Sequence, residues 1–257
     1  MENIRNFVIT IAGFDPSGGA GILADVKTME QHGVYGLGVC TAITFQNENR
    51  IEKIKWLSDE EVIDQLKIIS ETNTVTVAKI GIVRDVKMLN TILDFLISKN
   101  KNIKIIWDPV IKSTGGFDFH SEKNDWLSCL KKTFLITPNI SEAKILTGID
   151  DEEKAAFALA KQCNVLLKGG HSSSDRSDDL LFTPEKVVVI PGEKLNRSKH
   201  GTGCVLSSAI ASNLALGKNL AESCKLAKDY ITQFILSDEE LLGWHHTIKI
   251  KEYEHEL

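Results

Sequence analysis

Short apolar runs alternate with helical patterns along almost the whole chain, and this alternation constrains the fold more than any other feature. Six runs are apolar on consecutive positions and rich in β-branched residues, namely Phe7–Ala12, Leu37–Thr44, Val75–Ile82, Ile103–Asp108, Phe134–Thr137 and Val165–Lys168. Consecutive apolar positions are typical of parallel strands that are buried on both faces. The alternation therefore predicts a three-layer α/β/α sandwich with a mostly parallel central sheet.

Helical patterns fill the segments between these runs and follow the last one. They span Gly21–His32, Asp59–Glu71, Asp85–Lys99, Glu122–Lys131, Ser141–Leu146, Asp151–Gln162, Cys204–Leu216 and Leu220–Leu236. Ser58 and Glu61 have the spacing of a capping box, and Gly217 is suited to end a helix. Two further runs, Leu180–Thr183 and Val187–Ile190, are close enough to predict an antiparallel hairpin at one sheet edge. Without a long linker or repeat, residues 1–257 are expected to form one domain.

Composition and charge exclude several classes of protein. The chain has 257 residues, with 30 Lys and Arg against 35 Asp and Glu. This mildly acidic balance predicts no nucleic-acid partner and no membrane partner, because both need a basic surface. Five scattered cysteines without a C-x-x-C pair indicate neither a disulfide framework nor a zinc ribbon. No apolar run has a membrane-spanning length and no signal-peptide pattern is present, so a cytoplasmic location is expected.

Polar and glycine residues follow most of the predicted strands. In sheets of this kind, ligands bind outside the carboxyl ends of the strands, so these residues should converge on one edge. They are Gly13 to Gly21 with Asp25 in the next helix, Gln46, Lys79 to Ile82, Asp108, Asn139 with Glu142, Lys168, and His200 to Cys204 at the start of a helix. The convergence predicts a ligand site more strongly than any single motif.

Each motif also has a purely structural interpretation. The glycines from Gly18 to Gly21 match neither a Walker A loop nor G-x-G-x-x-G. Their structural interpretation is that they merely let a strand turn tightly into a helix. The stretch from Gly201 to Cys204 is either a helix-capping turn or an anion cradle of backbone amides. Asp108 could cap a turn, and Glu142 could be an acid in a first helical turn. Cys204 is either a core thiol or, at a helix start, a thiol of lowered pKa.

Taken together, these segments resemble the hydroxymethylpyrimidine/phosphomethylpyrimidine kinases of thiamine biosynthesis. The resemblance lies in the stretches 10–28, 39–47, 79–81, 108–110, 137–142, 168–171 and 200–204, which occur in the family's order. The first stretch and Gly201-Thr-Gly-Cys204 are its most specific parts. The family is ribokinase-like, so the resemblance implies that fold. The loop 111–117 departs from the family's pattern, and its role is left open.

The resemblance implies an ATP-dependent kinase that phosphorylates 4-amino-5-hydroxymethyl-2-methylpyrimidine to its monophosphate and then to its diphosphate. The implied cofactors are ATP and Mg²⁺, and the implied assembly is a homodimer. Gln46 would read the pyrimidine edge, because its amide offers one acceptor and one donor. The other implied roles fall to Asp25, Gly13 and Ile82 in the same pocket; to Gly201, Thr202, Gly203 and Cys204 in an anion hole; to Cys204 as base and Lys168 as a cation at the phosphates; to Asn139 at the nucleotide; and to Asp108 and Glu142 at the metal.

Two other functions are compatible with these residues. A pyridoxal kinase of the same superfamily is the nearer one, although Gln46 and Cys204 favour the pyrimidine. The other is a non-catalytic ligand-binding regulator on this fold, which would not need to keep Asp108, Glu142, Lys168 and Cys204 together. The sequence also leaves open whether both phosphorylation steps occur and whether a monovalent cation takes part.

Overall fold

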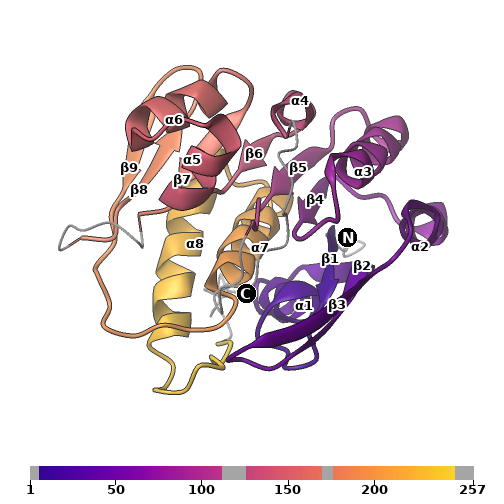
Figure 1. Ribbon diagram of the computed structural model, residues 1–257, viewed down its shortest axis with the longest axis horizontal. Coiled ribbons are helices and arrows are strands. Elements are labelled where there is room, and N and C mark those ends of the chain that lie inside the picture. Colours follow the sequence, from indigo (N-terminus) through magenta and orange to yellow (C-terminus); the bar gives the residue numbers. More distant parts are fainter. Residues whose placement is uncertain (1–5, 112–125, 170–175, 247–257) are drawn as a thin grey trace, which may run out of the picture.

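A single nine-stranded sheet forms the centre of the protein, whose computed structural model describes residues 6–111, 126–169 and 176–246 (Figure 1). The strands lie in the order β3-β2-β1-β4-β5-β6-β7-β8-β9. The parallel ones are β1 (Phe7–Phe14), β2 (Tyr35–Gln46), β4 (Val77–Ile80), β5 (Lys104–Trp107), β6 (Leu135–Ile136) and β7 (Asn164–Leu167). The antiparallel ones are β3 (Ile51–Trp56), β8 (Asp179–Phe182) and β9 (Val187–Ile190). The predicted mostly parallel sheet is confirmed.

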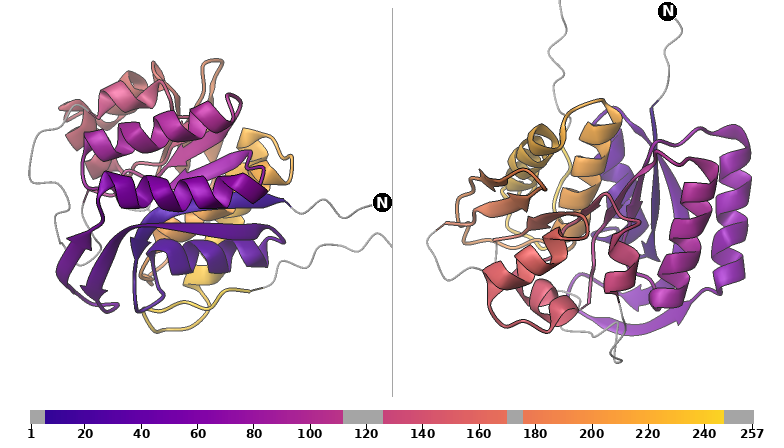
Figure 2. Two further views of the ribbon diagram at one scale, coloured as in Figure 1. Left: turned by 90° about the vertical axis from the view of Figure 1, so that its right-hand side faces the viewer. Right: turned by 90° about the horizontal axis from the view of Figure 1, so that it is seen from above.

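Helices cover both faces of this sheet and complete three layers (Figure 2). One layer holds α1 (Gly21–Gln31), α7 (Thr202–Ala215) and α8 (Leu220–Ile235). The other holds α2 (Asp59–Thr72), α3 (Val86–Lys99), α4 (Leu127–Leu130), α5 (Ile140–Thr147) and α6 (Glu152–Ala160). In the part of the chain that the structure describes, no helix is both long enough and apolar enough to cross a membrane.

Alternate residues of each central strand pack into opposite layers, which explains why these strands are apolar at most positions. In β1, Ile9 and Ile11 contact the core under α2 and α3, whereas Val8 contacts the core under α1 and α7. In β5, Ile105 and Ile106 are divided in the same way. Because strand side chains alternate with a period of two, a strand buried on both faces needs apolar residues throughout.

Most of the predicted element boundaries agree with the structure within one or two residues. Ser58 and Glu61 form the predicted capping box, and Gly217 follows α7 with a φ of +83°. The hairpin of β8 and β9 lies at one edge, as predicted. The helix expected over residues 122–131 corresponds in its described part to α4, and residues 122–125 lie outside the described residues.

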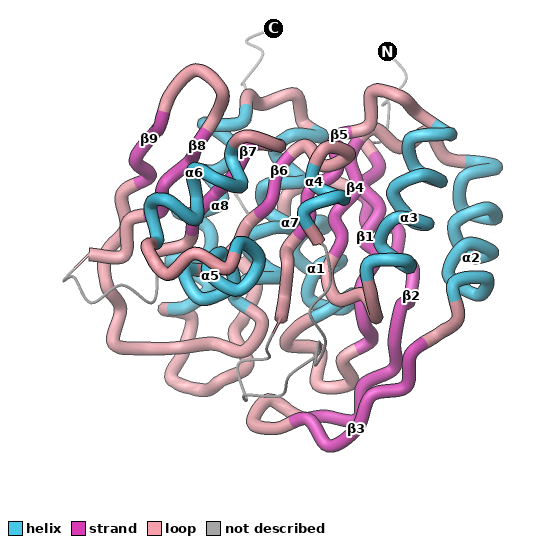
Figure 3. Tube along the Cα trace, turned by 45° about the horizontal axis from the view of Figure 1, so that its top comes forward, coloured by secondary structure: helices cyan, strands magenta, loops and turns pink. Residues whose placement is uncertain are grey.

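One strand was not predicted. Ile51–Trp56 forms β3, which pairs with β2 in antiparallel fashion at the other edge of the sheet. Three of its residues are charged and exposed, so it lacks the continuous apolar run of a buried strand. Figure 3 shows that β2 and β3 extend together beyond the rest of the sheet.

Candidate active site

Two glycine-rich loops meet where α1 and α7 begin. Gly201, the N-cap residue of α7, has a φ of +76°, and a Cβ there would lie 2.0 Å from the carbonyl oxygen of Gly19. Only glycine allows both the left-handed backbone and this close approach. Because Gly201 brings no capping side chain, the first amides of α7 are left to bind an anion. This geometry supports the anion-cradle interpretation of residues 201–204.

A buried carboxylate and a partly buried lysine face this cradle. A Cβ on Gly203 would lie 3.2 Å from Asp108 Oδ2 and 3.5 Å from Lys168 Nζ. Lys168 Nζ donates to Asp108 Oδ1 at 3.0 Å and lies 3.8 Å from Glu142 Oε2. Burial lowers the pKa of Lys168, but Asp108 and Glu142 outweigh it and raise that pKa above its ordinary value. The lysine is therefore a fixed cation beside the cradle.

The environment of Asp108 fits a hard divalent cation. Its Oδ1 also accepts a hydrogen bond from Thr137 Oγ1 at 3.0 Å. Its Oδ2 is buried and has no hydrogen-bond partner within the described ranges. A buried carboxylate oxygen without a donor is unfavourable unless a cation binds it, and carboxylate oxygens are the ligands that Mg²⁺ prefers.

Glu142 combines its predicted position at the site with a structural role. Asn139 and Glu142 form a reciprocal capping box at the start of α5, with distances of 2.7 and 2.8 Å. Glu142 Oε2 thus accepts the backbone N–H of Asn139. Burial raises the pKa of Glu142, and Lys168 opposes that rise. Glu142 is therefore both the acid in the first turn of α5 and a neighbour of Lys168.

Cys204 lies in the first turn of α7, and of the two alternatives that the sequence left open, its environment in the free protein favours the core thiol over a thiol of lowered pKa. Burial raises the pKa of its thiol to about 11, although Lys79 and the backbone N–H of Gly21 act in the opposite direction. Desolvation of the thiolate therefore outweighs the effect of the helix start.

Asp25 occupies a different place from the one predicted. It is fully buried, and its oxygens accept hydrogen bonds from Thr10 Oγ1, from Ser208 Oγ at 2.7 Å and from Lys79 Nζ at 2.8 and 3.0 Å. Ser208 is one helical turn beyond Cys204, so this cluster lies beneath the cradle. Neither Asp25 nor Lys79 has any exposed surface.

Of the other residues predicted for the substrate pocket, Gly13 and Ile82 meet where β1 and β4 end. A Cβ on Gly13 would lie 2.5 Å from Ile82 Cδ1, so these two positions are in direct contact. Gln46 ends β2, and Asp15 directly follows β1. The buried contacts of Asp15 with His200 and of Lys79 with Asp25 were not foreseen. A lysine inside an otherwise apolar strand was the signal that could have identified Lys79.

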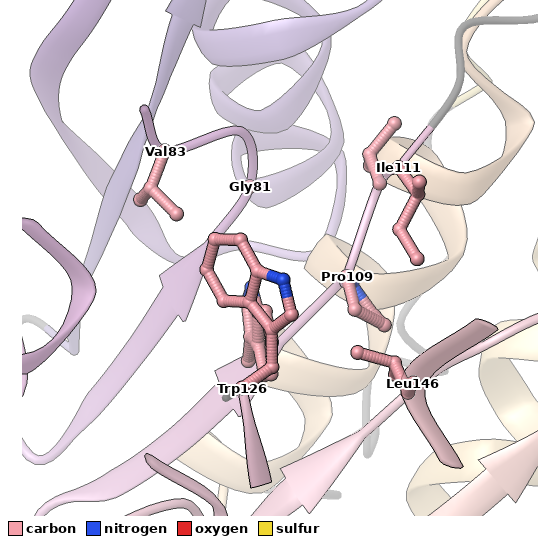
Figure 4. A pocket seen from close by; sticks show the side chains of 8 residues that line it. Gly81, Val83, Pro109, Ile111, Trp126 and Leu146 are labelled. Atoms are coloured by element: carbon pink, nitrogen blue, oxygen red, sulfur yellow. The ribbon is translucent and has the colours of Figure 1, made fainter. Parts of the chain in front are cut away.

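A small apolar pocket lies next to this edge, between the segments that follow β4 and β5 (Figure 4). Trp126, Pro109 and Ile111 line it together with Gly81. Ile111 is the only described residue of the loop 111–117, and His171 also lies outside the described residues. The role of that loop stays open.

Comparison with known proteins gives one consistent result. The family model for phosphomethylpyrimidine kinase matches residues 15–249. A hydroxymethylpyrimidine/phosphomethylpyrimidine kinase of Aquifex aeolicus is 35% identical over 249 residues, covering 91% of this chain and 95% of the relative. The crystal structure of a phosphomethylpyrimidine kinase from Clostridium difficile 630 has a TM-score of 0.76 at 33% identity, covering 89% and 99% of the two chains. The ADP complex of a Bacillus subtilis pyridoxal kinase has a TM-score of 0.76 at 27% identity, covering 90% and 92%.

Proposed function

The chain belongs to the phosphomethylpyrimidine kinase family, and from this we propose that it phosphorylates 4-amino-5-hydroxymethyl-2-methylpyrimidine in thiamine biosynthesis. ATP donates one phosphoryl group to the hydroxymethyl oxygen and a second one to the resulting monophosphate. The observation that carries the proposal is the ion pair of Lys168 with the buried Asp108, which faces Gly203 in a cradle of backbone amides. This arrangement supplies fixed positive charge and rigid donors, which phosphoryl transfer requires.

In this proposal the transferring phosphoryl group lies over the first turn of α7. The amides of Thr202, Gly203 and Cys204 donate to its oxygens, and Lys168 neutralises part of their charge as a point cation. Asn139 uses its side-chain oxygen to cap α5, so its amide nitrogen is the group available to the nucleotide. These donors are held by backbone and buried contacts, and they need little rearrangement as charge develops.

Asp108 and Glu142 would hold Mg²⁺, with Asp108 Oδ2 as the free ligand atom. When bound, this ion neutralises charge on the nucleotide phosphates. Lys168 Nζ donates a hydrogen bond to Asp108 Oδ1 at 3.0 Å, so the other carboxylate oxygen, Oδ2, faces the cradle. Thr137, which follows the neighbouring strand β6, donates a hydrogen bond to the same oxygen.

Cys204 acts as the base in the first step. In the free protein a thiol pKa of about 11 leaves about one thiol in ten thousand ionised at pH 7. Lys79 favours the thiolate from beneath the cradle. The second step uses a phosphate that is already anionic, so it depends less on a base. Cys204→Ala should therefore slow the first step more than the second, whereas equal slowing would overturn the role.

Purified protein with Mg-ATP provides the test, with ADP release measured for hydroxymethylpyrimidine, its monophosphate and pyridoxal separately. Turnover of both pyrimidines with weak turnover of pyridoxal supports the proposal. Cys163→Ala is the matched control for Cys204→Ala, because Cys163 packs against the core after α6, away from the cradle. Turnover of pyridoxal alone would favour a pyridoxal kinase, the function named for the Bacillus subtilis structure. No turnover of any acceptor would favour a non-catalytic regulator.

The proposal also includes the quaternary state and location expected from the resemblance. We propose one domain that assembles as a homodimer in the cytoplasm. Sedimentation equilibrium of the purified protein tests the dimer, since a monomer mass of 28.5 kDa at micromolar concentration would contradict it.

A further inference from the structure

Asp15 directly follows β1 and is almost completely buried, with 2% of its surface exposed. Its Oδ1 accepts hydrogen bonds from the backbone N–H and from the hydroxyl of Ser17, both at 2.8 Å. Its Oδ2 accepts the backbone N–H of Ala20, the N-cap residue of α1, at 2.9 Å. The carboxylate therefore holds the first glycine loop around itself up to the start of α1.

His200 is a further partner of this carboxylate, and it lies on the other glycine loop. It directly precedes Gly201, the N-cap residue of α7, and 8% of its surface is exposed. Its Nε2 lies 2.9 Å from Asp15 Oδ2. Its Nδ1 is buried and has no hydrogen-bond partner within the described part of the chain. Among the described residues, the bond to Asp15 is therefore the only hydrogen bond of this imidazole.

The ionisation of Asp15 fixes the direction of this bond. Burial raises the pKa of Asp15, but hydrogen bonds outweigh burial, the one with His200 most of all, and the pKa falls to about 2. At neutral pH the carboxylate is ionised and can only accept hydrogen bonds. Nε2 of His200 therefore carries the hydrogen and donates it, and hydrogen bonds to an ionised group are among the stronger ones in proteins.

The Asp15–His200 bond joins two loops that also touch through their backbones. A Cβ on Gly201 would lie 2.0 Å from the carbonyl oxygen of Gly19, and a Cβ on Gly19 would lie 2.6 Å from Cδ2 of His200. The loop that Asp15 holds is thus packed directly against the residues that open the cradle. Gly13, in the predicted pyrimidine pocket, lies only two residues before Asp15. The bond therefore connects the predicted acceptor pocket with the cradle.

We propose that Asp15 and His200 are positioning residues that lock the first glycine loop to the cradle, and so hold the acceptor oxygen at a constant distance from the transferring phosphoryl group. The inference rests on the proposed function, because it assumes an acceptor near Gly13 and a phosphoryl group at the start of α7. Since misplacing reacting groups by about 1 Å can slow a reaction about a hundredfold, the bond should affect kcat more than KM.

Two substitutions at His200 separate the hydrogen bond from packing. Glutamine places an N–H group near the position of the histidine Nε2 but lacks the ring, whereas phenylalanine keeps a ring and lacks a donor. ADP release with Mg-ATP and hydroxymethylpyrimidine gives kcat and KM for each protein. We expect His200→Gln to keep kcat within about threefold of wild type, and His200→Phe to lose at least about tenfold in kcat with KM changed less than about threefold. A role in packing alone would reverse this order.

The matched controls are His246→Gln and His246→Phe, because His246 is exposed, and both should keep the wild-type kcat. If His200→Phe keeps kcat at least as well as His200→Gln does, or if both lose it equally, the inference is wrong and the proposed function stands. If the wild type releases no ADP with this acceptor, the proposed function is overturned and the inference with it.

A measurement of the bond itself covers the case in which His200→Phe does not fold. In ¹⁵N-labelled wild type at neutral pH, the ring N–H of His200 should give a signal that is protected from exchange with water, assigned by its loss in His200→Gln. His32, whose Nδ1 lies 2.8 Å from the Thr28 carbonyl oxygen, is the protected reference, and the exposed His246 should give no such signal. Absence of the His200 signal would overturn the inference even if the wild type turns over both pyrimidines.

Discussion

Lys79→Met tests the buried ion pair beneath the cradle. Lys79 and Asp25 are both fully buried, and their atoms approach to 2.8 Å. Removing the ammonium leaves the Asp25 carboxylate in the core with hydroxyl donors from Thr10 and Ser208 only. Breaking a buried pair from one side costs about 3–5 kcal/mol, which is a large part of the 5–15 kcal/mol typical of a whole domain. We expect the free energy of unfolding to fall by that amount.

Urea unfolding at pH 7 measures this loss in Lys79→Met, in Asp25→Asn and in the double variant. The double variant should lose at least about 2 kcal/mol less than the sum of the two single losses, because it buries no unpaired charge. Lys67→Met is the matched control, because the pair of Lys67 with Asp64 is more than half exposed and should matter by less than about 1 kcal/mol. Additive losses, or a Lys79→Met loss below about 1 kcal/mol, would refute the reasoning.

Three further predictions concern the loops around the site. Because burial raises the pKa of the Cys204 thiol to about 11, its alkylation by iodoacetamide in the free protein should keep accelerating up to that pH; a plateau near pH 8 would show that burial does not dominate. The folded pKa of Asp15 is about 2, below its ordinary 3.8, so Asp15 should stabilise the fold by about 2 kcal/mol above pH 4 and lose this contribution as the pH falls toward 2. Unfolding measured between pH 2 and 5 should show this slope in wild type and a weaker one in Asp15→Asn. Gly201→Ala should lower the free energy of unfolding by at least about 2 kcal/mol more than Gly148→Ala in thermal unfolding, because both have positive φ but a Cβ at Gly148 meets nothing within 4 Å. Equal losses would contradict the close approach to Gly19.

The sheet could be predicted from the sequence because its central strands are buried on both faces. The apolar runs around Ile9 and Ile105 indicate such strands by themselves, without information from distant parts of the chain. The strand Ile51–Trp56 escaped prediction for the opposite reason. It lies at an edge, exposes charged side chains and is defined by its pairing with β2. The alternation of apolar runs and helical patterns does not indicate the pairing of β3 with β2, so this pairing is visible only in the folded chain.

The location of the site was predictable from the residues that follow each strand, but the state of its groups was not. A helix start lowers a thiol pKa, yet desolvation outweighs this effect at Cys204. Asp25 sits in a helix beside the glycine loop, where a ligand contact was reasonable, but Lys79 and Ser208 occupy its oxygens. Burial and partner identity are properties of the packed structure, and local sequence does not determine them.

In the proposed reaction, one cradle carries two successive phosphoryl transfers onto the same pyrimidine. Mass spectrometry of a reaction of purified protein with Mg-ATP and hydroxymethylpyrimidine follows both transfers directly over time. We expect a monophosphate that rises first and then declines as a diphosphate accumulates. A monophosphate that accumulates without conversion, even when it is supplied as the starting substrate, would contradict the proposed reaction.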